Sequence, residues 1–246
     1  MKNKIALVTG GTRGIGNSIS EKLLEEGAFV IAVSKNKKIN KEWVVSQKKL
    51  GFDKVDAYTC NVADYDDCQT VVADIKNKYG KVDILINNAG VTRDSLFNKM
   101  DKISWDAVMQ TNLGGVFNIT RPVIELMLDN RYGRIVNISS VNGQRGQSGQ
   151  ANYAAAKAGI YGFTTSLARE TARKNITVNT VSPGYIATEM VMNMPEKIRR
   201  GIVSQVPVGR LGTTKEIADL VVFLTKENSG YITGADFSIN GGLHMS

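Results

Sequence analysis

Short apolar segments recur along the chain, and this recurrence restricts the fold more than any other feature of the sequence. The segments span residues 5–8, 29–33, 82–86, 135–138 and 176–181, and a last short strand is expected at 236–239. Most are continuous runs of Val, Ile and Leu, as in parallel strands that are buried on both faces. Helix-like segments separate them. Such an alternation predicts an α/β fold whose mostly parallel sheet carries helices on both faces.

The chain of 246 residues is long enough to bury a core without disulfides or metals. No repeat, low-complexity tract or Pro/Gly/Ser-rich linker divides it, so we expect a single domain over 1–246. The least regular part spans 185–212 and contains Pro195 and Pro207, two of the four prolines. We expect this part to be a substrate lid with short helices of its own.

The sequence indicates a cytoplasmic protein. The apolar run at 5–8 ends at Gly10 and Gly11, too soon for a signal peptide, and no apolar stretch approaches membrane-spanning length. The two cysteines, Cys60 and Cys68, are too few for a disulfide scaffold and have no partners at metal-ligand spacing. We therefore expect no membrane contact and no metal.

The formal charge is +8, from 31 basic and 23 acidic side chains. An excess of positive charge is compatible with nucleic-acid binding. However, the basic residues are scattered, and no nucleic-acid-binding motif is present. The one dense cluster, between Lys35 and Lys41, lies near the expected cofactor. Anionic small molecules explain the charge better than nucleic acid does.

A glycine-rich segment, Thr9–Gly16, follows the first apolar run directly and opens an amphipathic helix. Gly10, Gly14 and Gly16 have the spacing at which free backbone N–H groups and the positive helix end meet the phosphates of a dinucleotide. Because the motif stands between a strand and a helix, it predicts a dinucleotide site.

The end of the second strand indicates which dinucleotide is bound. In the usual fold an acidic residue about twenty positions after the glycines binds the adenosine ribose and favours NAD. Here the strand ends in Ser34, Lys35 and Asn36, without a carboxylate. Lys35 and the loop residue Arg13 are suited to a 2′-phosphate, so the sequence predicts NADP(H).

A third motif combines Ser140 with Tyr153 and Lys157. Residues four apart on a helix share a face, so Tyr153 and Lys157 are expected to project into one pocket. A free phenol has a pKa of about 10, and a nearby ammonium favours the phenolate. We therefore expect Lys157 to lower the pKa of Tyr153 and make it a general acid/base for a ketone or alcohol.

The expected helix at 152–173 carries Ala, Gly, Ser and Thr on several faces. Small residues allow close helix approach, which indicates packing against a partner subunit and an oligomer.

Taken in order, these motifs resemble the classical short-chain dehydrogenase/reductase family over essentially the whole chain. The matching residues are Thr9-Gly10-x-x-x-Gly14-x-Gly16, Asn87-Asn88-Ala89-Gly90, Asn112, Ser140, Tyr153-x-x-x-Lys157 and Pro183-Gly184. The resemblance implies a doubly wound Rossmann fold and assigns Asn112, Ser140, Tyr153 and Lys157 to catalysis. It selects Ser140 over Ser139 by its spacing from Tyr153, and Ser139 is expected to face the other side of an extended strand.

The resemblance also implies where the cofactor is held. The residues it assigns are Gly10, Thr12, Arg13, Gly14, Ile15, Gly16, Lys35, Asn61, Val62, Asn88, Ala89, Gly90, Pro183, Gly184 and Ile186. At the position of Asn61 the family more often has Asp. The implied reaction transfers a hydride from NADPH to a ketone carbon, while Ser140 and Tyr153 hydrogen-bond its oxygen and Tyr153 donates the proton.

Within the family the chain looks most like the acetoacetyl-CoA reductases of polyhydroxybutyrate synthesis, in segments 140–150 and 183–188 and in the ending 240–245. That group forms homotetramers and produces the (3R)-hydroxyacyl thioester. The resemblance places Asp94, Gln147, Gln150 and Tyr185 around the acetoacetyl thioester.

Three alternatives remain open at this stage. One is a 3-oxoacyl-[acyl-carrier-protein] reductase, in which Arg131 and Lys174 attract the acidic carrier, although the lid arginines Arg199, Arg200 and Arg210 also suit polyanionic coenzyme A. Another is a sugar or polyol dehydrogenase on the same fold. The last is a regulatory protein that senses NADP(H) without catalysis.

Overall fold

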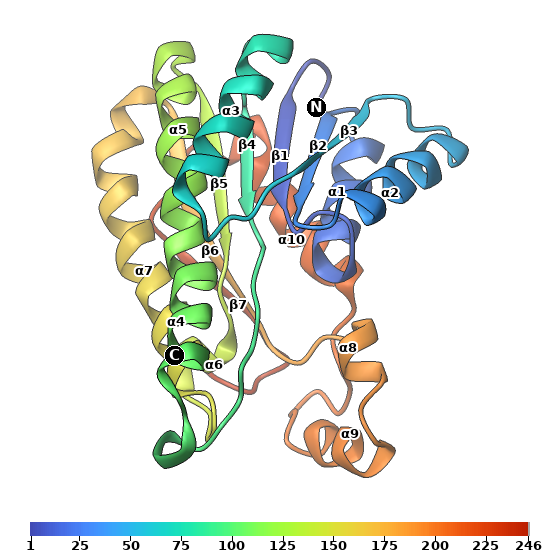
Figure 1. The fold of residues 1–246 in the computed structure, drawn as a ribbon, viewed down its shortest axis with the longest axis vertical. Helices are drawn as coiled ribbons and strands as arrows, with labels where there is room; N and C mark the ends of the chain where they lie inside the picture. The colour runs from blue at the N-terminus through green and yellow to red at the C-terminus, as the bar shows by residue number, and fades with distance from the viewer. Residues whose placement is uncertain (246) are drawn as a thin grey trace.

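A seven-stranded sheet in which every strand is parallel to its neighbours forms the centre of the protein (Figure 1). The computed structural model describes residues 1–245. The strands are β1 (Ile5–Thr9), β2 (Phe29–Ser34), β3 (Val55–Thr59), β4 (Ile84–Asn87), β5 (Gly133–Ile138), β6 (Ile176–Pro183) and β7 (Asp236–Ile239). The predicted α/β fold is confirmed, with a sheet that is parallel throughout.

The strand order is β3-β2-β1-β4-β5-β6-β7, so the chain reverses direction across the sheet between β1 and β4. The first strands build outward from β1 to β3, and the chain then returns to pair β4 with the other edge of β1. In such sheets a crevice opens outside the carboxyl ends of the strands where the order reverses, and ligands bind there. The topology therefore places the candidate site before any side chain is considered.

Helices cover both faces of the sheet. They are α1 (Gly14–Glu25), α2 (Lys37–Lys49), α3 (Tyr65–Tyr79), α4 (Lys102–Met109), α5 (Gly115–Asn130), α6 (Val141–Arg145), α7 (Ala151–Thr171), α8 (Glu189–Met192), α9 (Glu196–Val203) and α10 (Thr214–Thr225). One core joins α1, α2 and α10 to one sheet face, and the other joins α3, α5 and α7 to the opposite face. Successive strand side chains alternate between the cores: Ala6 and Val8 belong to the first and Leu7 to the second.

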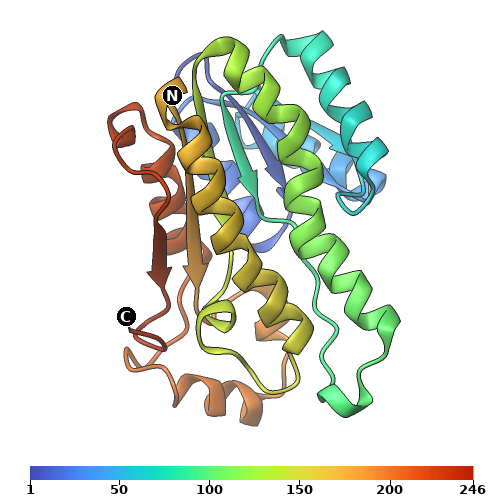
Figure 2. The same cartoon turned by 90° about the vertical axis from the view of Figure 1, so that its left-hand side faces the viewer.

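The carboxyl ends of the strands point toward the 185–212 segment. Figure 1 shows α8 and α9, drawn in orange, beyond these strand ends, and Figure 2 shows the arrowheads of β6 and β7 directed the same way. The segment contains two short helices, as predicted. Its ends are joined by a parallel bridge between Ile186 and Gly212, in which the N–H of Ala187 donates to the carbonyl of Gly212 at 2.8 Å.

One strand, β3, was not predicted. Its sequence, Val-Asp-Ala-Tyr-Thr, lacks a continuous apolar run, and only Val55 is fully buried. Because β3 lies at the edge of the sheet and pairs only with β2, it needs less apolar surface than the central strands. Within residues 1–245 no helix is long and apolar enough to cross a membrane.

Candidate functional site

The glycine-rich turn between β1 and α1 is built so that backbone atoms approach closely. Gly10 and Gly14 have φ angles of +62° and +54°, which side-chain-bearing residues rarely adopt. A Cβ at Gly16 would overlap the carbonyl oxygen of Gly10 and lie 2.5 Å from Nδ2 of Asn88. The turn thus forms a side-chain-free cradle at the amino terminus of α1, where N–H groups have no helical partner, and it fits a dinucleotide phosphate.

Asn88, just after β4, fixes this turn across the crevice. Its Nδ2 donates to the carbonyls of Thr9 at 2.9 Å and Gly10 at 3.2 Å. In return, the hydroxyl oxygen of Thr9 accepts from the N–H groups of Asn88 and Ala89, each at 3.0 Å. The ends of β1 and β4 are therefore locked together, and the segment 88–90 lies along the crevice.

The residues expected at the adenosine end of the cofactor follow β1, β2 and β3, at the same edge of the sheet. Arg13 is exposed at the residue before α1, and Lys35 is exposed directly after β2. Asn61 is half-buried after β3, and its Oδ1 accepts from the N–H of Ala63 at 3.2 Å. Val62 is buried, with 5% of its surface exposed. A cation, Lys35, thus stands where a carboxylate is usual, and Arg13 adds a second exposed cation at the glycine-rich turn.

The segment after β6 forms the far wall of the crevice. Pro183 ends the strand, and a Cβ at Gly184 would lie 2.7 Å from the Cα of Asn240, so the backbone of this segment packs directly on the residues after β7. Ile186 is buried. A Cβ at Gly14 would meet only the methyl group of Thr188, at 3.8 Å, so the glycine cradle and this segment face each other.

Ser140, Tyr153 and Lys157 come together beside the crevice. Ser140 follows β5 and caps α6, with its Oγ accepting from the N–H of Asn142 at 3.2 Å. Tyr153 and Lys157 share a face of α7, and Nζ of Lys157 lies 5.7 Å from the centre of the Tyr153 ring. The same Nζ lies 3.8 Å from where a Cβ at Gly90 would stand. Backbone, amine and phenol thus converge on one place.

Ser139 points away from this cluster, as predicted. It is buried, and its hydroxyl donates to the backbone carbonyl of Lys157 at 2.8 Å. Ser140 is only partly buried. Adjacent residues of extended backbone project to opposite sides, so one serine fastens the turn to α7 while the other presents its hydroxyl to the crevice.

Asn112 lies in a π-helical turn, Gln110–Gly114, between α4 and α5. Its side chain is fully buried and exchanges two hydrogen bonds with the backbone of Val91: Oδ1 accepts at 2.8 Å and Nδ2 donates at 2.9 Å. A Cβ at Gly90 would lie 3.3 Å from Asn112 Oδ1. π-helical turns occur frequently at functional sites, and this one brings the buried amide to the segment that lines the crevice.

Burial dominates the electrostatics of the cluster. It lowers the pKa of the Lys157 amine to about 8, since the charged form is desolvated. It raises the pKa of Tyr153, while a hydrogen bond with Ser140 acts in the opposite direction. The prediction that Tyr153 is acidified was therefore wrong in direction. A tyrosine that stays protonated is a proton donor, which suits reduction of a carbonyl.

Two of the four residues expected around the substrate are directly linked. Nε2 of Gln150 donates to Asp94 at 2.8 Å, and its Oε1 accepts from Nδ2 of Asn142 at 2.9 Å. Asn142 also donates its backbone N–H to Ser140, so a chain of hydrogen bonds runs from the serine to Asp94. Gln147 is exposed on the loop before α7.

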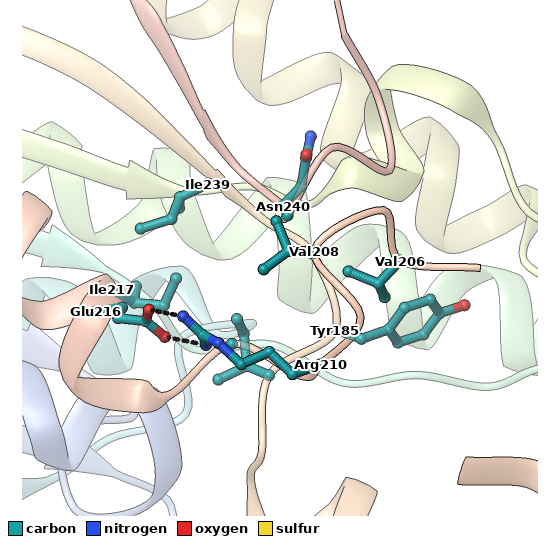
Figure 3. A pocket seen from close by; sticks show the side chains of 12 residues that line it. Tyr185, Val206, Val208, Arg210, Glu216, Ile217, Ile239 and Asn240 are labelled. Carbon is teal, nitrogen blue, oxygen red and sulfur yellow. Dashed lines mark hydrogen bonds and ion pairs between the residues drawn. The ribbon is translucent and has the colours of Figure 1, made fainter. Parts of the chain in front are cut away.

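Tyr185, the fourth of these residues, borders a cavity of about 160 Å³ between the 185–212 segment and the end of β7 (Figure 3). The walls are mainly apolar, with Val206, Val208, Ile217 and Ile239. At its edge Arg210 makes a two-pronged ion pair with Glu216, at 2.7 and 3.0 Å.

Comparison with known proteins agrees with this geometry. The family model described as short chain dehydrogenase matches residues 4–199. The chain belongs to this family. It is 53% identical, over the full length of both chains, to the acetoacetyl-CoA reductase of Cupriavidus necator. It is 48% identical to the 3-oxoacyl-[acyl-carrier-protein] reductase of Haemophilus influenzae, again over both full lengths. It is also 49% identical to nodulation protein G of Azospirillum brasilense, over 99% of each chain.

Membership of the short-chain dehydrogenase family makes the protein an oxidoreductase that works with a nicotinamide cofactor. The glycine cradle, Asn88 and the segment after β6 are the parts of this chain that suit such a cofactor. Among residues 1–245, no group of three His, Cys, Asp or Glu side chains is arranged to hold a metal ion.

The lid arginines that suit polyanionic coenzyme A each have a partner within the chain. Arg210 is held by Glu216, and Arg200 is paired with Glu196 at 2.6 Å. Arg199 donates to the carbonyl of Met192 at 3.0 Å.

Arg131 and Lys174 lie just before β5 and β6, at the end of the sheet opposite Ser140. Six strand residues separate the two ends, which amounts to roughly 20 Å. In one chain these two cations therefore do not reach a substrate that is bound at Ser140.

Sequence reasoning missed several residues that shape the site. Val91 holds Asn112, Asn142 links Ser140 to Gln150, and Thr188 faces the glycine cradle. Their roles depend on contacts between distant segments. Asn142 and Thr188 stood in stretches that the sequence had already singled out, 140–150 and 183–188, whereas Val91 did not.

Proposed function

We propose that the protein reduces acetoacetyl-CoA to (3R)-3-hydroxybutanoyl-CoA with NADPH. The observation that carries the proposal is the convergence of Ser140, Tyr153 and Lys157 beside Gly90 at the carboxyl ends of the central strands. A relative 53% identical to the chain is named for this reaction. The (3R) product follows the resemblance to that group.

The cofactor-holding residues form three groups. The cradle at Gly10, Gly14 and Gly16 takes the phosphates, with Thr12 and Ile15 as neighbours in the same turn. Arg13 and Lys35 take the 2′-phosphate, because both are exposed cations at the crevice. The remaining contacts are made by Asn61, Val62, Asn88, Ala89, Gly90, Pro183, Gly184 and Ile186. When bound, NADPH supplies the hydride.

Tyr153 and Ser140 act on the carbonyl oxygen of the substrate. Both hydroxyls donate hydrogen bonds to it, and Tyr153 transfers its proton to the oxygen as negative charge develops there. The raised pKa of Tyr153 keeps this proton in place before the reaction. Donors fixed in advance toward a developing oxyanion are a large source of rate enhancement.

Lys157 and Asn112 support the tyrosine. The ammonium of Lys157 stabilises the phenolate that forms when Tyr153 gives up its proton. Nζ of Lys157 is held in place because it donates to the carbonyl of Ile138 at 2.7 Å. We assign to Asn112 the task of holding a water that connects Lys157 to solvent. A proton lost from Tyr153 is thereby replaced after each turnover.

The thioester is held beside this cluster. Asp94 and Gln150, which are linked to each other, together with Gln147 and Tyr185, offer polar partners for the carbonyl and amide groups of the acyl and pantetheine parts. The 185–212 segment closes over the substrate as a lid on the single domain 1–246. Its ends are fixed by the Ile186–Gly212 bridge, so movement is confined to the part between them.

Assembly as a cytoplasmic homotetramer is also part of the proposal. Ala151, Ala155, Ala158 and Gly162 are exposed along α7 and leave a face of small residues on which a second helix can pack closely. Sedimentation equilibrium is the test, and a monomer that retains full activity would exclude this part.

Acetoacetyl-[acyl-carrier protein] is the alternative substrate, because a relative 48% identical over the full length is named for that activity. The deciding experiment compares kcat/KM for acetoacetyl-CoA and for the carrier-bound substrate, with NADPH and with NADH. We expect the CoA thioester and NADPH to give the highest value. A higher value for the carrier-bound substrate would reverse the assignment, and absence of turnover with both would favour a polyol substrate or a non-catalytic, NADP(H)-sensing protein.

A further inference from the structure

Tyr161 lies on the same face of α7 as Tyr153 and Lys157, one further helical step of four residues along. Its hydroxyl lies 3.1 Å from two oxygens: the backbone carbonyl of Ser140 and the hydroxyl of Ser182. The side chain of Tyr161 is half-buried, and its hydroxyl points inward to the backbone of the turn that carries Ser140. It does not belong to the group that faces the crevice.

The turn that carries Ser140 is fastened to α7 at three points. The hydroxyl of Ser139 donates to the carbonyl of Lys157, and the hydroxyl of Tyr161 bonds the carbonyl of Ser140. At the third point, a Cβ at Gly143 would lie 2.9 Å from the backbone of Lys157, so α6 and α7 are in backbone contact there. Of these three contacts, only that of Tyr161 acts on the backbone of Ser140 itself.

Tyr161 is in turn oriented by a chain of polar groups. The hydroxyl of Ser182, a fully buried residue of β6, donates to Oδ1 of Asp236 at 2.6 Å. Oδ2 of Asp236 accepts from Nε2 of Gln144 at 2.7 Å, and Gln144 belongs to α6, which Ser140 caps. The contacts therefore form a closed ring that begins and ends at the turn after β5.

The direction of each hydrogen bond in the ring follows from counting protons. An ionised carboxylate only accepts, so the single proton of Ser182 is used on Asp236. Ser182 then accepts from Tyr161, whose own single proton is shared between Ser182 and the Ser140 carbonyl, at equal distances. Burial raises the pKa of Tyr161, so that proton is retained.

From this ring we infer that Tyr161 is a positioning residue for Ser140: it holds the backbone of the serine so that the hydroxyl points at the substrate oxygen. The inference rests on the proposed function, because it assumes that Ser140 donates to that oxygen. Placement of reacting groups to within a fraction of an ångström strongly affects rate, so a small displacement of the turn is expected to lower turnover.

The test is a double-mutant cycle with Tyr161→Phe and Ser140→Ala. Tyr161→Phe removes the hydroxyl oxygen and keeps the aromatic ring of the side chain. Neither partner is left without a hydrogen bond, because the Ser140 carbonyl still accepts from the N–H of Gly143 at 2.9 Å and the Ser182 hydroxyl still donates to Asp236. Tyr79→Phe is the matched control, since it also deletes a tyrosine hydroxyl that makes a hydrogen bond. Tyr79 lies on α3, remote from Ser140, and its hydroxyl donates to Asp56 at 2.6 Å.

We expect Tyr161→Phe to lower kcat for acetoacetyl-CoA by about three- to tenfold, the loss that corresponds to one hydrogen bond, with KM for NADPH and for the thioester changed by less than about twofold. In the Ser140→Ala background the same change should have no further effect. Tyr79→Phe should retain the wild-type kcat.

The inference is overturned if Tyr161→Phe leaves kcat unchanged, if it lowers kcat equally with and without Ser140, or if Tyr79→Phe causes the same loss. These outcomes differ from failure of the proposed function, in which the wild-type protein itself does not reduce acetoacetyl-CoA. If the wild type is active and Ser140→Ala has no effect, both the role of Ser140 and the role of Tyr161 are wrong.

Discussion

The amine of Lys157 donates a hydrogen bond to the backbone carbonyl of Ile138 at 2.7 Å, at the carboxyl end of β5. This bond fixes the amine at the edge of the sheet from which Ser140 also projects. Both partners are buried, with 4% of Lys157 and 5% of Ile138 exposed. The amine is therefore held in place but poorly solvated, which makes its charge sensitive to pH.

The first prediction concerns the dependence of turnover on pH. Burial lowers the pKa of Lys157 to about 8, so the ammonium becomes neutral as the pH rises through that value. If the charge stabilises the phenolate of Tyr153, kcat for reduction should fall as the pH rises through about 8. Tyr153 itself should not cause this fall, because its pKa is raised.

The measurement is kcat at saturating substrate at pH values below and above 8, for the wild type and for Lys157→Arg. Arginine keeps its charge at all these pH values, so any residual activity of the variant should not decline near pH 8. A wild-type profile that is flat through this region would contradict the role of the charge.

The second prediction concerns the hydroxyl of Tyr153. Tyr153→Phe keeps the ring in α7 but removes the proton donor, so kcat should fall by about a hundred- to ten-thousandfold, the range typical for loss of a general acid. Binding of NADPH, followed by its fluorescence, should change little. Near-normal turnover in this variant would refute the role of Tyr153, and Tyr79→Phe, remote from the site, serves as the control.

Much of the fold was predictable because it depends on local patterns. The central strands β1, β2, β4, β5 and β6 are buried on both faces, and they therefore read as apolar runs. The edge strand β3 escaped prediction because pairing on one side leaves Asp56 and Thr59 partly exposed. The central strands are visible in a single sequence, whereas β3, which has no continuous apolar run, is defined by its pairing with β2.

The contacts of the site likewise divide into those that a local pattern predicts and those that depend on how distant segments meet. The spacing of Tyr153 and Lys157 encodes their shared helix face, so the structure brings them together as predicted. The exchange between Asn112 and Val91 and the contact of Tyr161 with Ser140 join segments about twenty residues apart, and no local pattern encodes them. The direction of the Tyr153 pKa also depends on how deeply the fold buries the phenol, and the sequence gives no measure of this depth.

The third prediction concerns cofactor choice. Lys35 is exposed after β2, where a carboxylate would favour NAD. Lys35→Asp should lower kcat/KM for NADPH by more than about tenfold, since it replaces an attraction to the 2′-phosphate with a repulsion, and it should improve the value for NADH. Lys49→Asp, at the far end of α2, makes the same charge change away from the crevice and should alter neither value.

A wild-type preference for NADH would contradict the assignment of NADP(H) directly. Equal losses in Lys35→Asp and Lys49→Asp would show that overall charge, and not contact with a phosphate, determines the effect.

The last prediction concerns two requirements of the glycine cradle: a positive φ at Gly14 and the absence of a side chain at Gly16. Gly14 has a φ of +54° but open space, since a Cβ there would meet only Thr188 at 3.8 Å. Gly14→Ala should therefore cost only backbone strain, about 1–2 kcal/mol in the free energy of unfolding. At Gly16 a Cβ would overlap the Gly10 carbonyl and crowd Asn88, so Gly16→Ala must displace the turn itself.

Gly16→Ala should therefore lose more stability in urea than Gly14→Ala and should also lose most of its affinity for NADPH, because the cradle can no longer close. Gly51→Ala is the control: its positive φ of +90° also imposes backbone strain, nothing lies within 4 Å of the added Cβ, and the residue lies after α2 away from the crevice. It should lose stability but bind NADPH normally. Normal binding by Gly16→Ala would show that the phosphates are not held at this turn.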